Sequence, residues 1–471
     1  MALAHRVLTP TPILSLDEYV ARGGGKGLTA ARAAEPAAII EAVTESGLRG
    51  RGGAGFPVGR KWQTVAENQL AAGTPSTVVV NAAEGEPGTL KDRTILRRNP
   101  YLVVEGALIA ARAVGADLVV FATKRSFEGE VERVRAAVED IENDGWSEGV
   151  ELYVFEGPDE YLYGEESALL ETIDGRWPFP RVVTTFRRGL LGHVDEDTPV
   201  GPALVNNTES LANVPRIVDR GPAWYRTVGT ERSPGTVVCT VTGYTDHHGV
   251  GEVPMGTPLR EVIDEIGGGP REGRSIKAVM SGVATGLIPA SKLDTPVTYE
   301  DLAAIGSGVG SAGFIVFDDT VDMAAVAAGV ARFLAVESCG QCLPCKLDGM
   351  KLADLLARLS HSNLQQTDYD LMRRKVTEVG DRARCYLAIQ QQVVLTSILE
   401  LFGDELTDHL AGDDVAPVQP ELISELIDIR SGRAILDTRH WDKQPDWTYK
   451  ATYSGTVPVE LYTGKRPPWG S

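Results

Sequence analysis

The chain has 471 residues, which is too long for one ordinary hydrophobic core and predicts about three domains. Its apolar content of 43% and charged content of 24% are those of a folded protein, and no apolar run approaches the roughly 20 residues that span a bilayer. The formal net charge of −19 argues against nucleic-acid binding, because a protein that binds phosphate backbones needs a basic face.

The N-terminal segment and the cysteine content both indicate a cytoplasmic protein. The segment MALAHRVLTPTPIL has neither the apolar core nor the cleavage site of a secretory signal. Five cysteines in a chain of this length are too few for a disulfide scaffold. We therefore expect no direct membrane insertion, and any membrane association would come through partners in a larger complex.

Helices and strands alternate in the first half of the chain. In the segment PAAIIEAVTES (36–46), Ile39 and Val43 lie four positions apart, which indicates an amphipathic helix that ends at Gly47. Further elements are expected as a strand at 77–81, a helix at 102–113, a strand at 117–123, a helix at 131–141, a strand at 150–155 and a helix at 164–173. This alternation predicts a three-layer α/β domain with a largely parallel sheet.

The pattern changes near Gly235. Short strands at 236–244 and 313–317, separated by glycine turns and a helix at 258–266, predict a small α+β module. From 322 to about 410 the pattern is helical, and VLTSILELF (394–402) is its clearest segment. The remaining residues are rich in Pro, Asp, Trp and Tyr, show no periodicity and predict an extended tail.

The stretch GLRGRGGAGFPVGRKW (47–62) contains a dinucleotide fingerprint in an unusual context. Gly50, Gly52 and Gly55 satisfy G-x-G-x-x-G. In an ordinary Rossmann site this turn follows a strand and begins a helix. Here it follows the expected helix at 36–46 and precedes the first strand, so the ordinary NAD-binding interpretation fails.

A cysteine cluster lies in the C-terminal third. The segment ESCGQCLPC spaces Cys339, Cys342 and Cys345 three positions apart, and Cys385 follows further along the chain. Three such thiolates can hold three corners of a [4Fe-4S] cluster, and a remote fourth can close it. The alternatives are a four-thiolate zinc site, which usually has two separate C-x2-C pairs, or buried free thiols. Cys239, alone in an expected strand, is interpreted as core.

Six segments together resemble a known family. They are SGLRGRGGAGFPVGRKW, NAAEGEPGTLKDR, YLYGEESALLETIDG, VNNTESLANVP, VPMGTPLREVI and ESCGQCLPC. In order and spacing, from about residue 28 to 410, they resemble the NADH-oxidising FMN/[4Fe-4S] flavoprotein subunit of respiratory complex I, which is the F-type subunit of NADH-quinone oxidoreductase. The same type of flavoprotein serves NAD-reducing hydrogenases and NAD-dependent formate dehydrogenases.

The resemblance implies three domains and two extensions. The domains are a Rossmann-like FMN- and nucleotide-binding domain at 28–234, a ubiquitin-like SLBB domain at 235–320 and a helical bundle with a [4Fe-4S] cluster at 321–412. An N-terminal extension would occupy 1–27 and an extended C-terminal tail 413–471. These fold classes, α/β, α+β and all-α, agree with the three patterns above.

The resemblance also gives the glycine-rich loop a different role, in which it approaches FMN and the nicotinamide nucleotide together. A residue without a Cβ lets backbone N–H groups come close to a flat ring or a phosphate. Arg51 and Lys61 would add positive charge against phosphate or reduced flavin, and the alternative is a flexible surface loop. The glycines concerned are Gly50, Gly52, Gly53 and Gly55.

Other positions of the family's cofactor cavity are carried over one by one. The implied flavin contacts are Asn81, Glu84, Gly85, Asn206 and Asn207, and the same cavity would be lined by Tyr161, Gly164, Glu165 and Glu166. Glu86 would face the nucleotide, and together with Glu166 it is assigned to the catalytic site. Phe56 and Phe186 match aromatic positions that pack on the adenine. Without the resemblance, the acids at 165–166 are ordinary for the start of a helix, and the two phenylalanines are ordinary core.

The implied reaction is hydride transfer from NADH to FMN, or the reverse, with single-electron transfer between the flavin and the [4Fe-4S] cluster. The chemistry belongs to the cofactors, and the protein supplies position and electrostatics. One cluster cannot deliver electrons further, so we expect iron–sulfur partner subunits that include a thioredoxin-like [2Fe-2S] protein. The tail would wrap such a partner or be disordered, and its aromatic residues are Trp441, Trp447, Tyr449, Tyr453 and Trp469.

Several departures from the family bear on the electron donor. Ala83 replaces an acidic residue, Thr64 an aromatic one and Val183 a lysine, while Pro158 and Asp159 replace small residues. These positions belong to the nucleotide side of the cavity more than to the cluster side.

Two alternatives therefore stay open. In one, the chain exchanges electrons with NADP(H), for which Arg187 and Arg188 are available, or with a protein donor, within a formate dehydrogenase, a hydrogenase or another oxidoreductase complex. In the other, the chain is a non-catalytic scaffold that keeps the cluster for assembly.

Overall fold

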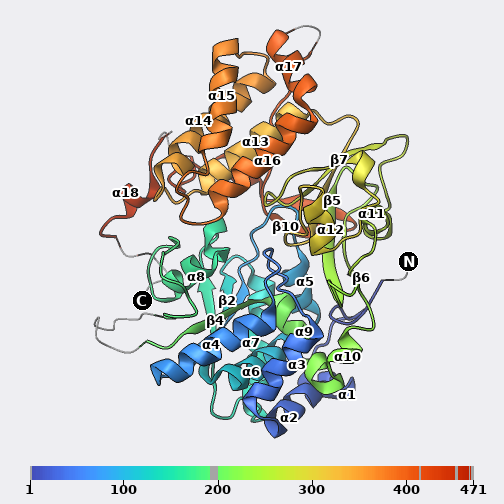
Figure 1. Ribbon diagram of the computed structural model, residues 1–471, viewed down its shortest axis with the longest axis vertical. Coiled ribbons are helices and arrows are strands. Elements are labelled where there is room, and N and C mark those ends of the chain that lie inside the picture. Colours follow the sequence, from blue (N-terminus) through green and yellow to red (C-terminus); the bar gives the residue numbers. More distant parts are fainter. Residues whose placement is uncertain (1–2, 191–199, 413–414, 451–454, 466, 468–471) are drawn as a thin grey trace.

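The structure is a computed structural model that describes residues 3–190, 200–412, 415–450, 455–465 and 467 (Figure 1). An α/β region lies at the bottom of the view, a second sheet at its upper right, and a group of helices at the top. The segment after residue 414 runs back across these three regions.

A four-stranded parallel sheet forms the centre of the α/β region. Its strands are β1 (Ser76–Ala82), β2 (Ala116–Lys124), β3 (Glu151–Gly157) and β4 (Ala203–Asn207), in the order β3-β2-β1-β4. All three pairings are parallel, with Val79 of β1 opposite Val120 of β2 and Val205 of β4. The predicted α/β arrangement with a parallel sheet is therefore confirmed.

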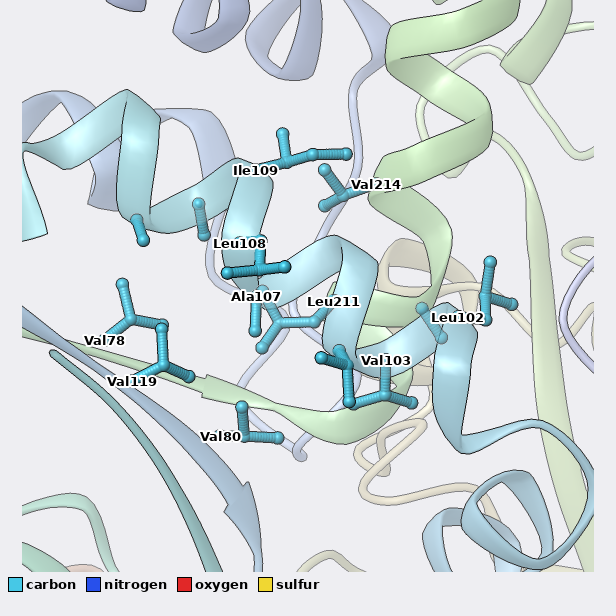
Figure 2. Close-up of a cluster of buried hydrophobic side chains, with 14 of the residues drawn as sticks. Val78, Val80, Leu102, Val103, Ala107, Leu108, Ile109, Val119, Leu211 and Val214 are labelled. Atoms are coloured by element: carbon cyan, nitrogen blue, oxygen red, sulfur yellow. The ribbon is translucent and has the colours of Figure 1, made fainter. Parts of the chain in front are cut away.

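Apolar side chains of β1 cover both faces of this sheet. Val78 and Val80 pack with residues of α6 (Pro100–Val114) and α9 (Thr208–Arg220), as Figure 2 shows. Val79 between them belongs to a separate apolar cluster on the other face, with Leu169 of α8 (Glu166–Ile173). Because both faces are buried, the strand is a continuous apolar run and not an alternating one.

The remaining helices of this region surround the sheet. The helix α3 (Pro36–Ser46) has the bounds predicted from its periodicity, and it ends at Gly47 with a φ of 71°, which favours glycine. The others are α1 (Leu16–Ala21), α2 (Lys26–Ala33), α4 (Val58–Ala72), α5 (Lys91–Arg98), α7 (Glu128–Asn143), the 3-10 turn η1 (Tyr161–Gly164) and α10 (Pro222–Tyr225).

The second sheet has five strands in the order β6-β5-β9-β7-β8. Its central pair, β5 with β9, is parallel, and the other pairings are antiparallel. Cys239 on β5 is fully buried in its core, as predicted. The elements are β5 (Thr236–Gly243), β6 (Gly249–Pro254), α11 (Leu259–Gly267), β7 (Ile276–Ser281), β8 (Ile288–Pro289), η2 (Ala290–Lys292), α12 (Tyr299–Ala304) and β9 (Gly313–Asp318).

Helices dominate from residue 323 to 411, as the sequence predicts. Asp322 caps the first of them, because its carboxylate accepts the backbone N–H groups of Ala324 and Ala325. The helices pack on one apolar core and are α13 (Met323–Glu337), the π-helical turn η3 (Pro344–Asp348), α14 (Gly349–Ser360), α15 (Gln366–Glu378), α16 (Leu387–Leu401) and α17 (Gly403–Ala411).

The C-terminal segment corrects the expectation of an extended or disordered tail. It forms a hairpin of β10 (Leu426–Arg430) and β11 (Arg433–Leu436), a 3-10 turn η4 (Thr438–Trp441) and a short helix α18 (Pro458–Tyr462). Trp447 is 4% exposed and packs in the core of the helical region, whereas Trp441 and Tyr449 are exposed. The tail therefore folds against its own chain, and Tyr453 and Trp469 lie outside the described residues.

None of the helices in the described ranges is long and apolar enough to cross a membrane.

Candidate functional site

The order of the parallel strands creates a switch point beside β1. From β1 the chain moves to β2 and β3 on one side, whereas β4 pairs with the other side of β1. Ligands of such sheets bind outside the carboxyl ends of the strands at this point. Several predicted residues gather there, since Asn81 lies near the end of β1, 84–86 follow it, and Asn207 ends β4.

The glycine-rich loop between α3 and α4 is fixed beside the end of β4. The N–H of Gly50 donates to the carbonyl of Phe56 at 2.8 Å, which closes the loop. A Cβ on Gly52 would lie 3.1 Å from Cβ of Asn207, and one on Gly55, whose φ is 62°, would lie 2.5 Å from the ring of Tyr299. Glycine is therefore required for these close approaches, and the backbone N–H groups lie against the strand ends where a flavin would bind.

Arg51 takes a position that differs from the expected one. Its guanidinium is buried and donates to the hydroxyls of Tyr299 at 3.0 Å and Tyr225 at 3.2 Å, and to the carbonyl of Thr236 at 2.9 Å. Its Nε lies 3.8 Å from Glu209. The charge of Arg51 is thus committed to protein groups that join the glycine-rich loop to the second sheet, and not to a phosphate.

Lys61 on α4 does reach the predicted carboxylates. Its Nζ lies 2.7 Å from Glu166 at the start of α8, and Glu166 also accepts a hydrogen bond from Thr185. Both Lys61 and Glu166 are partly exposed, so the pair faces the open side of the cavity. Glu165 instead caps α8 by accepting the N–H groups of Ser167 at 3.0 Å and Ala168 at 2.8 Å.

Asn81 and Glu84 hold the backbone of the strand ends. The amide of Asn81 donates to the carbonyl of Gly164 at 2.8 Å, which joins the loop after β1 to the loop after β3. Glu84 accepts the N–H of Asp92 at 3.0 Å at the start of α5. Burial, with the nearby Asp92 carboxylate, raises the pKa of Glu84 to about 7.

Gly85 lies against a buried ion pair that has no signature in the sequence. A Cβ there would lie 2.8 Å from Nζ of Lys124 and 2.9 Å from the carboxylate of Glu425. Lys124, at the end of β2, forms an ion pair with Glu425 and donates to the carbonyl of Asp159 at 3.2 Å. The flavin-side loop therefore rests on a side chain from the C-terminal segment.

Glu86 joins three parts of the molecule. Its carboxylate accepts the hydroxyl of Tyr161 at 2.6 Å and the backbone N–H of Val283 at 2.6 Å. The same hydroxyl accepts a hydrogen bond of 2.9 Å from Gln390 on α16. Burial raises the pKa of Glu86 to about 7, so the carboxyl can hold or release a proton near neutral pH.

The two asparagines of β4 have different partners. Asn206 is buried and accepts the indole N–H of Trp62 at 2.7 Å. Asn207 caps α9 and donates to Asp92 at 2.6 Å, while Lys91 donates to its amide oxygen at 3.3 Å. Asn207 thus lies in the polar part of the cavity, whereas Asn206 holds the helix that carries Lys61.

Sequence reasoning misses Lys91, although it lies in the quoted segment NAAEGEPGTLKDR. Its ammonium is fully buried 2.9 Å from Glu209 and 2.8 Å from Asp92. The available signal is a lysine and an aspartate at the start of a helix of mixed charge. Phe56 is 48% exposed beside Arg60, and Phe186 is only partly buried, so the two rings predicted for the adenine remain accessible.

The four predicted cluster cysteines line one cavity at the end of α13. Cys339, Cys342, Cys345 and Cys385 surround it together with Leu162 of η1. Burial raises the pKa of Cys345 to about 11 and of Cys385 to about 12, so these thiols stay protonated until iron displaces the proton. Among the described residues no three His, Cys, Asp or Glu side chains converge as for a single ion. Thiols spread around a shared cavity suit a cluster in which each binds its own iron.

The comparisons identify the class of protein that this fold and these sites define. Residues 43–216 match the family model described as the Nuo51 FMN-binding domain, and residues 325–409 match the NADH-ubiquinone oxidoreductase-F iron-sulfur binding region. Both segments coincide with the structural sites above, the first with the strand-end cavity and the second with the cysteine cavity.

Relatives along nearly the whole chain agree with this class. The F-type subunit of NADH-quinone oxidoreductase that is numbered 2 in Rhizobium meliloti (strain 1021) is 35% identical over 408 residues, which cover 84% of this chain and 94% of the relative. The NADP-reducing hydrogenase subunit HndC of Solidesulfovibrio fructosivorans is 34% identical, with 84% of this chain and 81% of the relative covered. A solved NAD⁺-reducing [NiFe]-hydrogenase in the H2-reduced state matches with a TM-score of 0.75 and 31% identity over 88% of this chain and 69% of that chain.

The chain belongs to the family of F-type subunits of NADH-quinone oxidoreductase. It is an oxidoreductase subunit with FMN, NADH and a [4Fe-4S] cluster as its cofactors and substrate, and it serves as an electron-input module. The relatives named above are subunits of larger enzymes.

Proposed function

We propose that this chain binds FMN at the carboxyl ends of β1 and β4, accepts NADH beside it, and passes electrons one at a time to a cluster held by its four cysteines. FMN, when bound, converts the two-electron hydride of NADH into single electrons that an iron–sulfur cluster can accept. The reverse direction uses the same residues.

The observation that carries the proposal is the position of the turn η1. Tyr161 at its start bonds Glu86 in the strand-end cavity, and Leu162, the next residue, lines the cavity of the four cysteines. One short turn thus forms part of both cavities. A flavin and a cluster bound in them would be neighbours, which single-electron transfer needs.

The flavin side of the cavity combines backbone donors with buried charge. The glycine-rich loop offers N–H groups beside Asn207, and Lys91 supplies a buried ammonium behind it. Positive charge and N–H groups favour phosphate and a reduced, anionic flavin ring. Lys61, held by Glu166, adds a second ammonium at the open side.

The nucleotide side is assigned to the partly exposed residues. Phe56 and Phe186 are accessible for an adenine ring, and Glu86 can accept polar hydrogens of the nicotinamide end. Because the hydride passes between cofactors, no nucleophile or general acid is required of the protein. Glu86 and Glu166 therefore act by orienting the nucleotide.

The domain division is proposed as 28–234, 235–320 and 321–412, with extensions at 1–27 and 413–471. For the middle domain we propose the ubiquitin-like SLBB fold. Support comes from the sheet order β6-β5-β9-β7-β8, its central parallel pair and the single helix between β6 and β7. For the third domain, the common apolar core of α13, α14 and α16 supports a helical bundle.

The proposed partners are iron–sulfur subunits, including a thioredoxin-like [2Fe-2S] protein. Exposed apolar side chains beside the cysteines support a docking surface close to the cluster, because Leu343 and Tyr386 are 63% and 58% exposed. Within such a complex the chain would act in the cytoplasm.

The second candidate function is exchange of electrons with NADP(H). The relative HndC belongs to an enzyme named for NADP reduction, and Arg187 lies exposed next to Phe186. A basic residue near the ribose favours a 2′-phosphate.

Anaerobic stopped-flow mixing with NADH and with NADPH tests both candidates. We expect NADH to bleach the flavin absorbance of the purified protein and then to produce a reduced-cluster signal in freeze-quenched electron paramagnetic resonance. Bleaching by NADPH alone would favour the second candidate. A protein with flavin that neither nucleotide bleaches would overturn both, and a protein without flavin would support the scaffold alternative.

A further inference from the structure

The C-terminal segment 421–449, here called the strap, contacts all three regions of the chain. It lies beyond residue 409, where the match to the iron–sulfur binding region ends. In the second sheet, Tyr244 donates to Glu421 at 2.7 Å, and His248 donates its backbone N–H to the carbonyl of Gly432 at 2.7 Å. In the α/β region, Arg97 pairs with Asp428 at 2.7 Å.

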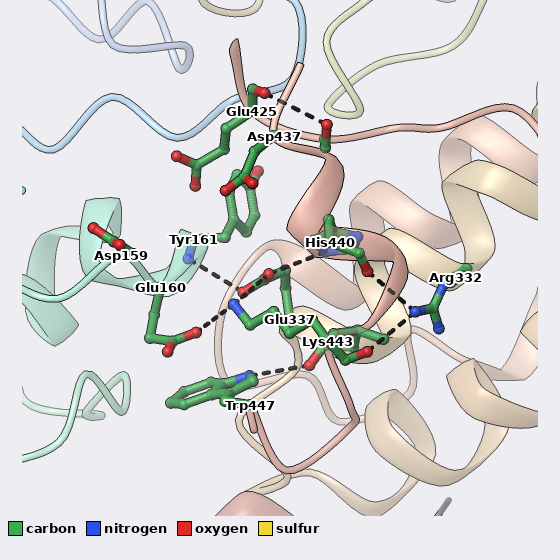
Figure 3. Close-up of polar contacts among 12 residues, drawn as sticks. Asp159, Glu160, Tyr161, Arg332, Glu337, Glu425, Asp437, His440, Lys443 and Trp447 are labelled. Atoms are coloured by element: carbon green, nitrogen blue, oxygen red, sulfur yellow. Dashed lines mark hydrogen bonds and ion pairs between the residues drawn. The ribbon is translucent and has the colours of Figure 1, made fainter. Parts of the chain in front are cut away.

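The strap is fastened most closely to the last turns of α13. Arg332 donates to the backbone carbonyls of Trp441 at 2.7 Å and Lys443 at 3.1 Å. The indole of Trp447 donates to the carbonyl of Val336 at 3.0 Å, and the ring of His440 stacks on Phe333 at 4.9 Å between centroids. These contacts hold the strap against the helix that ends just before Cys339 (Figure 3).

Lys443 inserts from the strap between the two loops that matter for electron transfer. Its side chain is 3% exposed, and Nζ lies 2.7 Å from Glu337 and 2.5 Å from Glu160. Glu160 directly precedes Tyr161 on the flavin side, and Glu337 lies two positions before Cys339 on the cluster side. Figure 3 shows the ammonium between these two carboxylates.

Glu337 completes the connection by a direct contact with the flavin-side loop. Its second carboxylate oxygen accepts the backbone N–H of Tyr161 at 3.2 Å, and its first accepts a hydrogen bond of 3.2 Å from His440. Glu160 and Glu337 carry like charges in a buried place, and such groups separate or take up water unless a cation lies between them. The charge of Lys443 therefore determines whether the two loops stay together.

We propose that Lys443 is a positioning residue, by which the strap holds the loop of Tyr161 and Leu162 against the cysteine loop and so sets the contact between flavin and cluster. The strap is then an internal clamp of the electron path. It acts through the two loops and touches no cofactor itself. The inference rests on the proposed function, because it assumes that electrons pass between these two cavities.

The test uses the full-length chain with three substitutions. Lys443→Met removes the ammonium and keeps most of the volume, and Lys443→Arg keeps the charge. Lys450→Met is the matched control, because Lys450 is exposed and directly follows the strap. Each purified variant is studied by hydrogen–deuterium exchange of the peptides that contain 160–165 and 338–345, and by rapid-mixing kinetics.

Lys443→Met is expected to raise amide exchange in both peptides and to slow cluster reduction by about tenfold or more, because small displacements of reacting groups cost large rate factors. The rate of flavin bleaching by NADH is expected to change by less than about twofold, since the nucleotide side does not depend on Lys443. Lys443→Arg is expected to restore both readouts, and Lys450→Met to change neither.

Unchanged exchange and unchanged cluster reduction in Lys443→Met would overturn the proposal. If that variant does not fold, Trp447→Phe keeps an aromatic ring but removes the bond to Val336, and the same two peptides must then exchange faster. Exchange is independent of NADH, and the flavin can be reduced chemically. A failure of NADH to bleach the flavin would therefore reject the proposed function without deciding about the strap.

Discussion

The hydroxyl of Tyr161 donates a 2.6 Å hydrogen bond to the carboxylate of Glu86 and accepts a 2.9 Å hydrogen bond from Gln390. Glu86 also accepts the N–H of Val283 at 2.6 Å. Residues from the loop after β1, the loop after β3, the second sheet and α16 thus meet at one buried carboxylate. A change at this point affects the nucleotide side and the relative position of the regions together.

Glu86→Gln is expected to gain stability relative to the unchanged protein as the pH rises. Burial raises the pKa of Glu86 from 4.5 to about 7, so the folded protein binds more protons than the unfolded chain in this interval. Wild-type stability therefore falls as the pH rises from about 4.5 to 7, by an amount on the order of 3 kcal/mol. Glutamine does not titrate and escapes this loss.

Urea unfolding of both proteins at pH 5 and pH 8 measures this difference. Glu148→Gln, which removes an exposed carboxylate, is the control for the change in net charge. A stability difference between Glu86→Gln and wild type that is the same at both pH values would contradict the raised pKa.

Much of the fold follows from local patterns. The helix at 36–46 and the strands with continuous apolar runs are predictable to within one or two residues, because burial on both faces leaves a strong signal in the sequence. The cysteine spacing likewise indicates a shared cavity for residues that lie far apart in the chain.

The parts that could not be predicted depend on contacts distant in sequence. Nothing near Arg51 indicates that its guanidinium binds Tyr225 and Tyr299, so the sequence alone assigns it to a phosphate. Lys443 and Glu425 lie in a segment without periodicity, and their partners Glu337 and Lys124 are separated from them by more than 100 residues. Charge pairing of this kind has no local sequence signature.

Gly55→Ala is expected to destabilise the protein more than Gly73→Ala does. Both positions have positive φ, 62° and 68°, but a Cβ on Gly55 would lie 2.5 Å from the ring of Tyr299, while nothing lies within 4 Å of one on Gly73. Backbone strain alone costs about 1 kcal/mol, and the collision adds roughly 1–3 kcal/mol. Thermal unfolding of the two variants compares them directly, and equal losses would show that the loop moves freely away from Tyr299.

Cys385→Ser is expected to lower the iron content per flavin and to remove the [4Fe-4S] electron paramagnetic resonance signal of the reduced protein. A cube held by four thiolates loses one ligand and becomes labile. Cys239→Ala is the control, because Cys239 is fully buried in the second sheet. Iron analysis with a flavin assay on both purified variants gives the result. An unchanged iron-to-flavin ratio in Cys385→Ser would remove this cysteine from the ligand set.

Val183→Lys is expected to lower the KM for NADH. The family carries a lysine at this position, and Val183 is 48% exposed close in sequence to Phe186, so a lysine there can reach a bound nucleotide without repacking the core. An exposed ammonium on a pyrophosphate contributes about 1 kcal/mol, which corresponds to roughly a fivefold lower KM. Since the new contact is with the pyrophosphate and not with the 2′ position, the KM for NADPH should fall by a similar factor and kcat should stay unchanged.

The control for this lysine is Val182→Lys, one position away and 76% exposed, which should alter neither KM nor kcat. Steady-state kinetics with an artificial acceptor at low and high salt measure the effect of each substitution. The gain from Val183→Lys must shrink at high salt if it is electrostatic, because ions screen an exposed ammonium. Equal kinetics for the two lysine variants would indicate that the nucleotide does not pass this loop.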